Sequence, residues 1–322
     1  MNKEAVIGID IGGTSSKYGL VDRSGVVYTE GSIKTYEYKD VNSFLKALHS
    51  AILKSVNELG DSFEIKGIGI GAPNGNYYNG SIEFAPNLRW KGKIPLAELL
   101  HDYFNVPVVL TNDANAAALG EMMYGSAKNM DHFIVITLGT GLGSGIVVDG
   151  QVVYGHDGFA GEMGHITAVE NGRICGCGRK GCLETYASAS GIKRTVFELF
   201  ATMNEDSELR AVSFNDLTAD MITRAADKGD IIALKAFDYT AEILGKKLAD
   251  AVAFTSPEAF FLFGGLANAG DYLFKPTRRY MEENLLQVFR NKVKILPSGL
   301  MNTNAAVLGA SGLIWKELQE NK

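Results

Sequence analysis

Two stretches of the chain share one pattern, "AVIGIDIGGTSSKYGLVDRSGVVYTEG" at residues 5–31 and "FIVITLGTGLGSGIVVDGQVVYG" at residues 133–155. Each alternates β-branched residues with glycine-rich turns, which predicts strands joined by tight turns. A shift of 127 positions superposes Ile7 on Ile134, Ile9 on Ile136, Gly12 on Gly139, Val21 on Val148 and Asp22 on Asp149. Two glycine hairpins can align by chance, but the register shared along the whole unit favours an internal duplication.

The rest of the chain alternates helices with buried strands. Apolar residues at helical spacing predict helices at 40–60, 191–203, 231–254 and 303–319. Apolar runs predict buried strands at 65–73 and 258–266, and a strand that runs directly into a helix at 106–125. This alternation predicts an α/β fold in two lobes. We place the small lobe at 1–118, with a C-terminal helix of about 303–322 packed on it, and the large lobe at 119–302.

Composition narrows the class of protein. A chain of 322 residues with 46% hydrophobic and 21% charged residues predicts a globular protein with more than one core. A net charge of -6 argues against a nucleic-acid partner. Asp10 interrupts the N-terminal apolar run, and residues 251–270 contain Ser256, Pro257 and Glu258, so we expect neither a secretory signal nor a membrane span. A reducing cytoplasm is then the default location, where clustered cysteines indicate a metal or catalytic site.

Three glycine-rich turns follow predicted strands: "DIGGT" at 10–14, "LGTGLGSG" at 138–145 and "FGGLANAG" at 263–270. Exposed backbone amides in such turns suit phosphate oxygens, although none has the Walker A or the Rossmann spacing. A single glycine turn is often only a turn, but three of them, two related by duplication, favour a nucleotide. Asp10 would lie near the phosphates, where a carboxylate requires a divalent cation to screen it.

A series of motifs in a fixed order carries a family resemblance. They are "GIDIGGT", "GIGIGAPNG", "APNLRW", "TNDANAAALGE", "TLGTGLGSGIVVDG", "GFAGEMGHI", "CGCGRKGCLETYAS" and "FGGLANAG". Over essentially its whole length the chain resembles the ROK family of kinases and repressors, within the actin, hexokinase and heat-shock ATPase superfamily. The resemblance implies a two-lobed, actin-like (ribonuclease H-like) fold closing over a cleft, ATP-dependent sugar kinase activity with Mg2+, and a homodimer formed through the large lobe.

Asp113 in "TNDAN" matches the catalytic base of that family. A sugar hydroxyl does not ionise at neutral pH, so an aligned carboxylate must accept its proton as the phosphoryl group arrives. The competing interpretation is a helix cap, because Asn112, Asp113 and Asn115 stand where a predicted strand meets a predicted helix. Both interpretations can hold, since a helix N-terminus stabilises an ionised aspartate.

The resemblance also assigns binding residues. Carboxylate and amide groups suit the alternating hydroxyls of a pyranose, and sugar contacts are implied at Asn87, Asn112, Asp113, Glu162, His165 and Glu184. Contacts with ATP are implied at Asp10, Gly12, Gly13, Thr14, Lys17, Thr140, Gly141, Gly264 and Gly265. Ser15 stands where many members of the family have a lysine, and in this chain the basic residue comes two positions later, at Lys17.

The chain has three cysteines, and all lie within eight positions of one another. With His165 of "EMGH", Cys175, Cys177 and Cys182 form the Cys3His set of a closed structural zinc site. A redox pair and inert buried thiols are the alternatives, but C-x-C is not the thioredoxin-like C-x-x-C, and inert cysteines are not expected to cluster. We hypothesise that zinc holds one nitrogen of His165 so that the other faces the sugar.

The sequence therefore predicts a kinase that transfers the ATP γ-phosphoryl group to the 6-hydroxyl of a hexose, with glucose the first choice. Fructose, mannose, allose or an N-acetylhexosamine are alternative substrates. A sugar-sensing protein without catalysis is a less favoured alternative. For a repressor we expect a helix-turn-helix domain ahead of the first glycine turn, and "DIGGT" begins at residue 10.

Overall fold

The computed structural model describes residues 3–60, 63–301 and 304–320. The chain divides into two compact units by its internal contacts. Unit 1 contains residues 1–130, 152–160 and 299–322, and unit 2 contains residues 131–151 and 161–298. These bounds differ from the predicted lobes, because residues 119–130 and the short segment 152–160 belong to unit 1. Of the helix predicted at 303–322, residues 303, 321 and 322 lie outside the described part of the chain.

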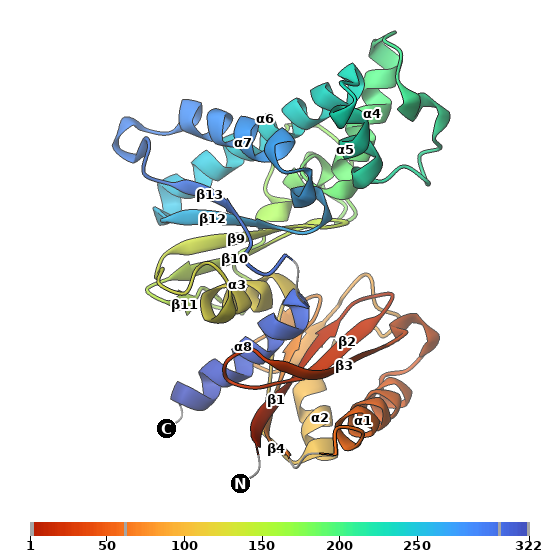
Figure 1. The fold of residues 1–322 in the computed structure, drawn as a ribbon, viewed down its shortest axis with the longest axis vertical. Coiled ribbons are helices and arrows are strands. Elements are labelled where there is room, and N and C mark those ends of the chain that lie inside the picture. Colours follow the sequence, from red (N-terminus) through yellow and green to blue (C-terminus); the bar gives the residue numbers. More distant parts are fainter. Residues whose placement is uncertain (1–2, 61–62, 302–303, 321–322) are drawn as a thin grey trace. The chain divides into compact units, whose positions relative to one another are not determined.

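Unit 1 is built on a five-stranded sheet with the order β3-β2-β1-β4-β8 (Figure 1). Its strands are β1 (Lys3–Ile11), β2 (Ser16–Val21), β3 (Val27–Ile33), β4 (Phe63–Gly71) and β8 (Val108–Thr111). Its helices are α1 (Val41–Asn57), α2 (Leu96–Phe104), α3 (Asp113–Tyr124) and α8 (Ala305–Glu320). Unit 1 also has a small sheet of β5 (Gly75–Asn76), β6 (Ser81–Glu83) and β7 (Lys93–Ile94). The sequence analysis predicted neither these strands nor α2.

The two faces of this sheet carry different residues. In β1 and β4, the alternate residues Ile7, Ile9, Ile68 and Ile70 are buried in one core with Phe44 and Leu45 of α1 and Leu100 of α2. Glycines alternate with them and face α8 and α3, since a Cβ on Gly69 would lie 1.8 Å from the backbone oxygen of Ala310. Gly19, Gly8 and Gly69 lie side by side across β2, β1 and β4. We call these three residues the glycine stripe, and its lack of side chains lets the backbone of α8 approach the sheet.

The short segment 152–160 is held on unit 1 by a group of aromatic and polar contacts. The rings of Tyr77 and Tyr154 are stacked with centroids 4.1 Å apart. Tyr78 donates a hydrogen bond to the Gly155 carbonyl at 2.6 Å, and Asn76 donates to the Asp157 carbonyl at 2.7 Å. The predicted lobes place this segment in the large lobe, because no linker or charge block separates it from its neighbours in the sequence.

Unit 2 repeats the sheet arrangement of unit 1. Its order is β11-β10-β9-β12-β13, with β9 (Phe133–Leu138), β10 (Leu142–Val148), β11 (Gln151–Val152), β12 (Ala259–Phe263) and β13 (Lys294–Pro297). Its helices are α4 (Ala189–Thr202), α5 (Ala219–Asp227), α6 (Ile231–Thr255) and α7 (Asp271–Asn284). The core packs Phe237, Leu244, Leu248 and Val252 of α6 with Phe260 and Leu262 of β12. Both sheets thus place an antiparallel hairpin beside two parallel strands, as the predicted duplication requires.

The register of the two hairpins corrects one detail of that duplication. Ile7 pairs with Leu20, whereas Ile134, its counterpart after a shift of 127, pairs with Ile146. The second strand of the later hairpin is therefore displaced by one residue, and the superposition of Val21 on Val148 does not match the pairing. The cause is turn length, because residues 12–15 join β1 to β2 but only residues 139–141 join β9 to β10.

None of the helices within the described residues is long and apolar enough to cross a membrane.

Candidate functional site

Two carboxylates stand at one edge of the unit 1 sheet. Asp10 is the penultimate residue of β1, and Asp113 is the first residue of α3, which follows β8. In the sheet Asp10 lies opposite Lys17 of β2 on one side and Gly71 of β4 on the other. A Cβ on Gly71 would lie 3.7 Å from the Cα of Asp113. Gly71 thus lets the start of α3, with Asp113 and Ala116, pack closely against β4 beside Asp10.

The charge of Asp10 is poorly compensated in the protein. Burial raises the pKa of the Asp10 carboxyl to about 6; the Asp113 carboxylate adds to this rise, and Lys17 opposes it. Lys17 itself is exposed, so its charge is largely solvated. A group that ionises near neutrality in this place is suited to face a cation brought by a ligand.

The N-cap of α3 and the candidate catalytic carboxylate are two different residues. Asn112 is the N-cap of α3, and its Oδ1 accepts a hydrogen bond from the Asn115 backbone N–H at 2.7 Å. Asp113 Oδ1 accepts a hydrogen bond from the adjacent Ala114 N–H at 2.9 Å. Desolvation raises the pKa of Asp113 and hydrogen bonds from the Ala114 and Asp113 N–H groups lower it, although the residue as a whole is exposed. The predicted cap is therefore Asn112, which leaves Asp113 available for proton transfer.

The first glycine turn lies against a predicted sugar-binding residue. The turn is closed by a hydrogen bond of 3.0 Å from the Gly12 N–H to the Ser15 carbonyl. A Cβ on Gly13 would lie 2.5 Å from the backbone oxygen of Asn87, so the two segments pack in contact. Thr14 and the Asn87 side chain are both exposed beside this contact. The structure thus brings two of the sequence-predicted groups in unit 1 together.

The second and third glycine turns converge at the end of β9 in unit 2. Gly264 has a φ of 105°, and a Cβ there would lie 2.7 Å from the Leu138 carbonyl oxygen. Thr140 is exposed in the turn that follows Leu138. Gly265 has open space where a side chain would be, whereas a Cβ on Gly141 would lie 2.6 Å from Glu184 Oε2. The predicted phosphate turn therefore borders the segment that carries Glu184.

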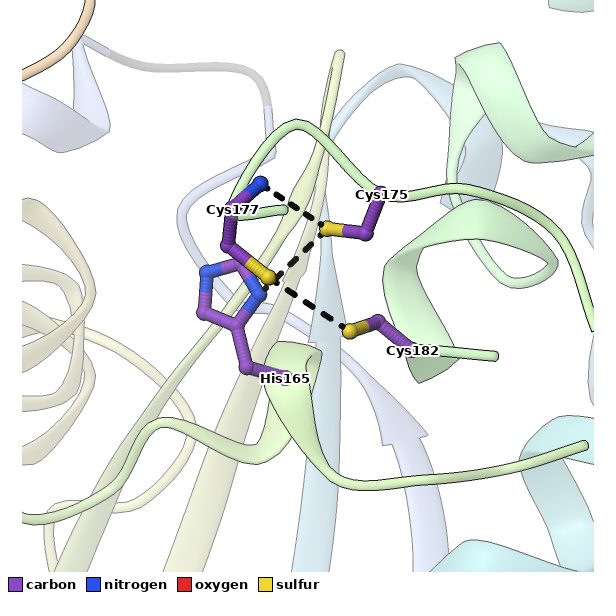
Figure 2. A group of neighbouring side chains, drawn as sticks. All are labelled: His165, Cys175, Cys177 and Cys182. Atoms are coloured by element: carbon purple, nitrogen blue, oxygen red, sulfur yellow. Dashed lines mark hydrogen bonds between the residues drawn. The ribbon is translucent and has the colours of Figure 1, made fainter. Parts of the chain in front are cut away.

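The cysteines and His165 form a group with the dimensions of a tetrahedral zinc site (Figure 2). Their ligand atoms all lie within 4.8 Å of one another. Cys177 Sγ is 3.7 Å from Cys182 Sγ, and Cys175 Sγ is 3.7 Å from His165 Nδ1. A zinc ion with Zn–S distances of ~2.3 Å and tetrahedral angles separates its ligand atoms by about 3.7 Å. The donor set and its spacing therefore fit zinc, and we call residues 175–182 the cysteine loop.

His165 and Glu184 join this group to the predicted sugar-binding residues. Nδ1 of His165 faces the sulfurs, and Nε2 points away from them (Figure 2). Cys175 Sγ donates a hydrogen bond to Glu184 Oε1 at 2.9 Å, and His165 Nδ1 lies 3.8 Å from the same oxygen. Glu162 is exposed just before the turn of 3-10 helix η2 (Met163–His165). One nitrogen of His165 is thus directed to the metal site while the other is available to a ligand.

Two residues that the sequence analysis did not single out support this region. The buried Ser144 of β10 donates a hydrogen bond to the Gly161 carbonyl and accepts one from the Met163 N–H at 3.2 Å. It thereby fixes the backbone on both sides of Glu162. Arg173 lies just before the cysteine loop, and its side chain makes several hydrogen bonds. Ser144 lies within the motif "TLGTGLGSGIVVDG", where the glycines suggested phosphate binding, and Arg173 lies outside the quoted motifs, so the sequence indicated this role for neither residue.

Replacing Asp10 by asparagine is expected to stabilise the ligand-free protein in a pH-dependent manner. The unfolded chain loses the Asp10 proton near pH 4 and the folded protein near pH 6, so ionisation costs stability as pH rises through this window. The gain from Asp10→Asn should grow from below about 1 kcal/mol at pH 4 to about 3 kcal/mol at pH 7.5. Urea unfolding at both pH values, without nucleotide or Mg2+, measures it.

Asp22→Asn is the matched control, and its effect on the free energy of unfolding is expected to have the opposite sign. Burial favours a higher pKa for Asp22, but hydrogen bonds from Ser24, Val26 and Tyr28 outweigh it and leave the pKa lowered. Asp22 therefore contributes stability above pH 4 that is lost as pH falls through its folded pKa, and Asp22→Asn should cost more at pH 7.5 than at low pH. A pH-independent gain for Asp10→Asn would contradict the assigned burial of the Asp10 charge.

Comparison with known proteins places this geometry in a family. Residues 6–317 match the ROK family. The glucokinase of Halalkalibacterium halodurans is 36% identical, over 100% of this chain and 97% of that protein. The xylose repressor of Caldicellulosiruptor bescii is 30% identical, over 99% of this chain and 80% of that protein. The crystal structure of a ROK family glucokinase from Streptomyces griseus, in complex with glucose and AMPPNP, is 32% identical with a TM-score of 0.80, covering 96% of this chain and 98% of that one.

These similarities confirm the α/β, two-lobed, actin-like fold class predicted from the sequence. The His and Cys cluster is of the kind typical of ROK zinc sites. The match extends over nearly the whole chain and includes both sheets and the cysteine loop. The protein therefore belongs to the ROK family.

Proposed function

We propose that the protein is an ATP-dependent hexose kinase that phosphorylates the 6-hydroxyl of its sugar, with glucose the favoured substrate. The observation that carries this proposal is the Asp113 carboxylate, which is open to solvent while Asn112 performs the helix capping. The similarity to proteins named glucokinase supports the sugar kinase class and favours glucose.

In the proposed reaction Asp113 accepts the proton of the sugar 6-hydroxyl. The hydroxyl oxygen attacks the γ-phosphorus of ATP, a new P–O bond forms, and the bond from that phosphorus to the β-phosphate oxygen breaks to release ADP. The raised pKa of Asp113 brings its basicity closer to neutral pH, which favours proton transfer. An accurately placed carboxylate of this kind contributes on the order of 10² to 10⁴ in rate.

Nucleotide binding is proposed for the glycine turns. The backbone amides of Gly12, Gly13 and Gly141, with the hydroxyls of Thr14 and Thr140, would hold phosphate oxygens. Gly264 and Gly265 are proposed to pass beneath the adenosine. Mg2+, when bound with ATP, supplies positive charge to the phosphates. Asp10 would face that charge, and the half-buried carboxylate would be stabilised in its ionised form.

Sugar recognition is proposed for Asn87, Asn112, Glu162, His165 and Glu184. Glu162 and Glu184 would accept hydrogen bonds from hydroxyl groups, and Nε2 of His165 would form one more. Zinc would be held by His165, Cys175, Cys177 and Cys182, and would supply a rigid cross-link, since a site with four protein ligands has no position for substrate. This arrangement fixes the orientation of the imidazole that reads the sugar.

A panel of sugars tests this function. The purified protein is given ATP, Mg2+ and glucose, fructose, mannose, allose, an N-acetylhexosamine or xylose, and ADP release is followed with a coupled assay. We expect glucose to give the highest kcat/KM. A higher kcat/KM for another hexose would reassign the substrate within the kinase class.

A sugar-sensing protein without catalysis is the second candidate, because a xylose repressor matches 99% of this chain. Binding of a sugar in calorimetry without any sugar-dependent ADP release would favour this alternative. We further propose a homodimer, for which light scattering of the purified protein should give twice the mass of the 34.7 kDa chain.

A further inference from the structure

The side chain of Arg173 is buried, and each of its N–H groups donates a hydrogen bond. Its side chain is only 8% exposed. Nε donates to one oxygen of Glu198 at 2.8 Å and Nη2 to the other at 2.5 Å. Nη1 donates to the carbonyls of Thr185 and Gly191, and Nη2 also donates to Thr195 Oγ1. These contacts use all five N–H groups that an arginine side chain has.

The chemistry of the guanidinium explains why arginine occupies this position. Burying a cation costs free energy unless the cation is paired with an anion and hydrogen-bonded. The two carboxylate oxygens of Glu198 provide both for Arg173. The guanidinium also lies over the ring of Tyr186, with its carbon 4.3 Å from the ring centroid. A lysine has three donors at a single nitrogen and cannot reproduce this set.

The backbone of Arg173 closes the base of the cysteine loop. Its carbonyl accepts a hydrogen bond from the Gly181 N–H at 2.8 Å, and its N–H donates to Tyr186 Oη at 2.9 Å. Cys175 follows Arg173 by two positions, and Cys182 follows Gly181 directly. Both ends of the segment that carries the cysteines are therefore fixed by bonds that involve no metal.

The same side chain holds the segment that carries Glu184. Thr185, whose carbonyl Arg173 contacts at 2.6 Å, is the next residue after Glu184. Gly191, Thr195 and Glu198 all lie in α4, so the guanidinium ties the 3-10 helix η3 (Leu183–Thr185) to that helix. Movement of Glu184 away from this place would break hydrogen bonds of a buried charge.

We propose that Arg173 is the positioning residue of this region: it presets the cysteine loop for its metal and holds Glu184 for its sugar. Zinc then binds ligands that are already close together, which lowers the ordering cost of binding. Arg173 acts through these residues and touches neither the metal nor the sugar. The inference rests on the proposed zinc and sugar sites and deepens both.

Four variants test the proposal in the full-length protein. Arg173→Met removes the donors, Arg173→Lys keeps the charge, and Glu198→Gln weakens the buried pair from its more exposed side. Arg210→Met is the matched control, because Arg210 lies over the ring of Phe200 at 4.7 Å and donates to three backbone carbonyls away from the cysteine loop. The readouts are zinc affinity by competition with a chromophoric chelator, and the KM for glucose and kcat.

Arg173→Met is expected to weaken zinc binding and raise the KM for glucose by about tenfold each, with kcat nearly unchanged. Arg173→Lys should recover part of both losses, Glu198→Gln should show smaller changes in the same direction, and Arg210→Met should show neither. A folded Arg173→Met protein with wild-type zinc affinity and KM overturns the proposal. If Arg173→Met fails to fold, wild-type values for both quantities in Glu198→Gln overturn it instead.

The same measurements distinguish a failure of this proposal from a failure of the proposed zinc and sugar sites. A wild-type protein that binds no zinc would contradict the proposed metal site, and the KM comparison would then decide the role of Arg173 at the sugar site. If the wild-type protein phosphorylates no sugar, calorimetric glucose affinity replaces KM. Loss of zinc affinity in Arg173→Met alone, with unchanged glucose binding, would overturn the part of the proposal that concerns Glu184.

Discussion

Asp113→Asn is expected to lower kcat by about 10³-fold while glucose binding changes less than about threefold. Asparagine has nearly the same shape but cannot accept the proton of the 6-hydroxyl. The fold of α3 should survive, because its N-cap hydrogen bond comes from Asn112 and not from Asp113. A coupled ADP assay gives kcat, and calorimetry gives the dissociation constant for glucose.

Asp40→Asn is the control for loss of a carboxylate at a helix N-terminus in unit 1. Asp40 caps α1 through a hydrogen bond of 2.9 Å from the Ser43 N–H to its Oδ1, an interaction that asparagine can also make. This variant should keep wild-type kcat. If Asp113→Asn retained more than about a tenth of the wild-type kcat, Asp113 would not be the base.

Cys177→Ser is expected to abolish stoichiometric zinc binding and to raise the KM for glucose by about 10- to 100-fold, with a smaller effect on kcat. Cys177 is the suitable ligand to remove because it is exposed, whereas Cys175 and Cys182 are buried and their replacement would also alter packing. Zinc is proposed to hold Nδ1 of His165, so without the metal the ring would lose the bond that fixes its orientation. Metal analysis of the purified protein and steady-state kinetics measure the two effects.

Lys180→Ser is the control within the cysteine loop, since Lys180 is exposed and is not one of the four ligands. It should retain zinc and a wild-type KM. A zinc-free Cys177→Ser protein with normal glucose affinity would show that the metal does not serve sugar recognition. Full zinc content in that variant would remove Cys177 from the ligand set.

The sequence predicted best what depends on short-range patterns. The helical spacing of Phe44, Leu45, Leu48 and Ile52 identified α1, whose observed span is Val41–Asn57. The apolar run at 65–73 identified a buried strand, and the structure adds that its isoleucines and glycines face different helices. These features follow from local patterns of apolar residues, so one sequence was sufficient.

Features that depend on long-range pairing could not be predicted in this way. The one-residue difference between the two hairpins arises from turn length, which the uniform shift of 127 positions ignored. The proximity of Asp10 to Asp113 follows from the parallel pairing of β1 with β4 and of β4 with β8. Short elements such as β5, β6 and β7 contain too few residues to show a period.

The sequence analysis identified some residues of the candidate site and not others. Spacing and residue type identified the cysteines and His165, because metal ligands must have particular chemistry. Arg173 and Ser144 act through backbone carbonyls and amides, and any carbonyl has the same chemistry whatever its side chain. Residues of this kind are visible only when the folded backbone is known.

The glycine stripe has a consequence for synthesis of the protein on the ribosome. Gly8, Gly19 and Gly69 are covered by α8, but residues 12–304 separate β1 from that helix. At ~5–20 residues per second, the nascent strands wait about 15 to 60 s before α8 has been made. During that time the glycine stripe lacks the helix that covers it in the folded protein, and the uninterrupted segment 161–298 of unit 2 is translated. Unit 1 should therefore be the last part of the chain to complete its fold.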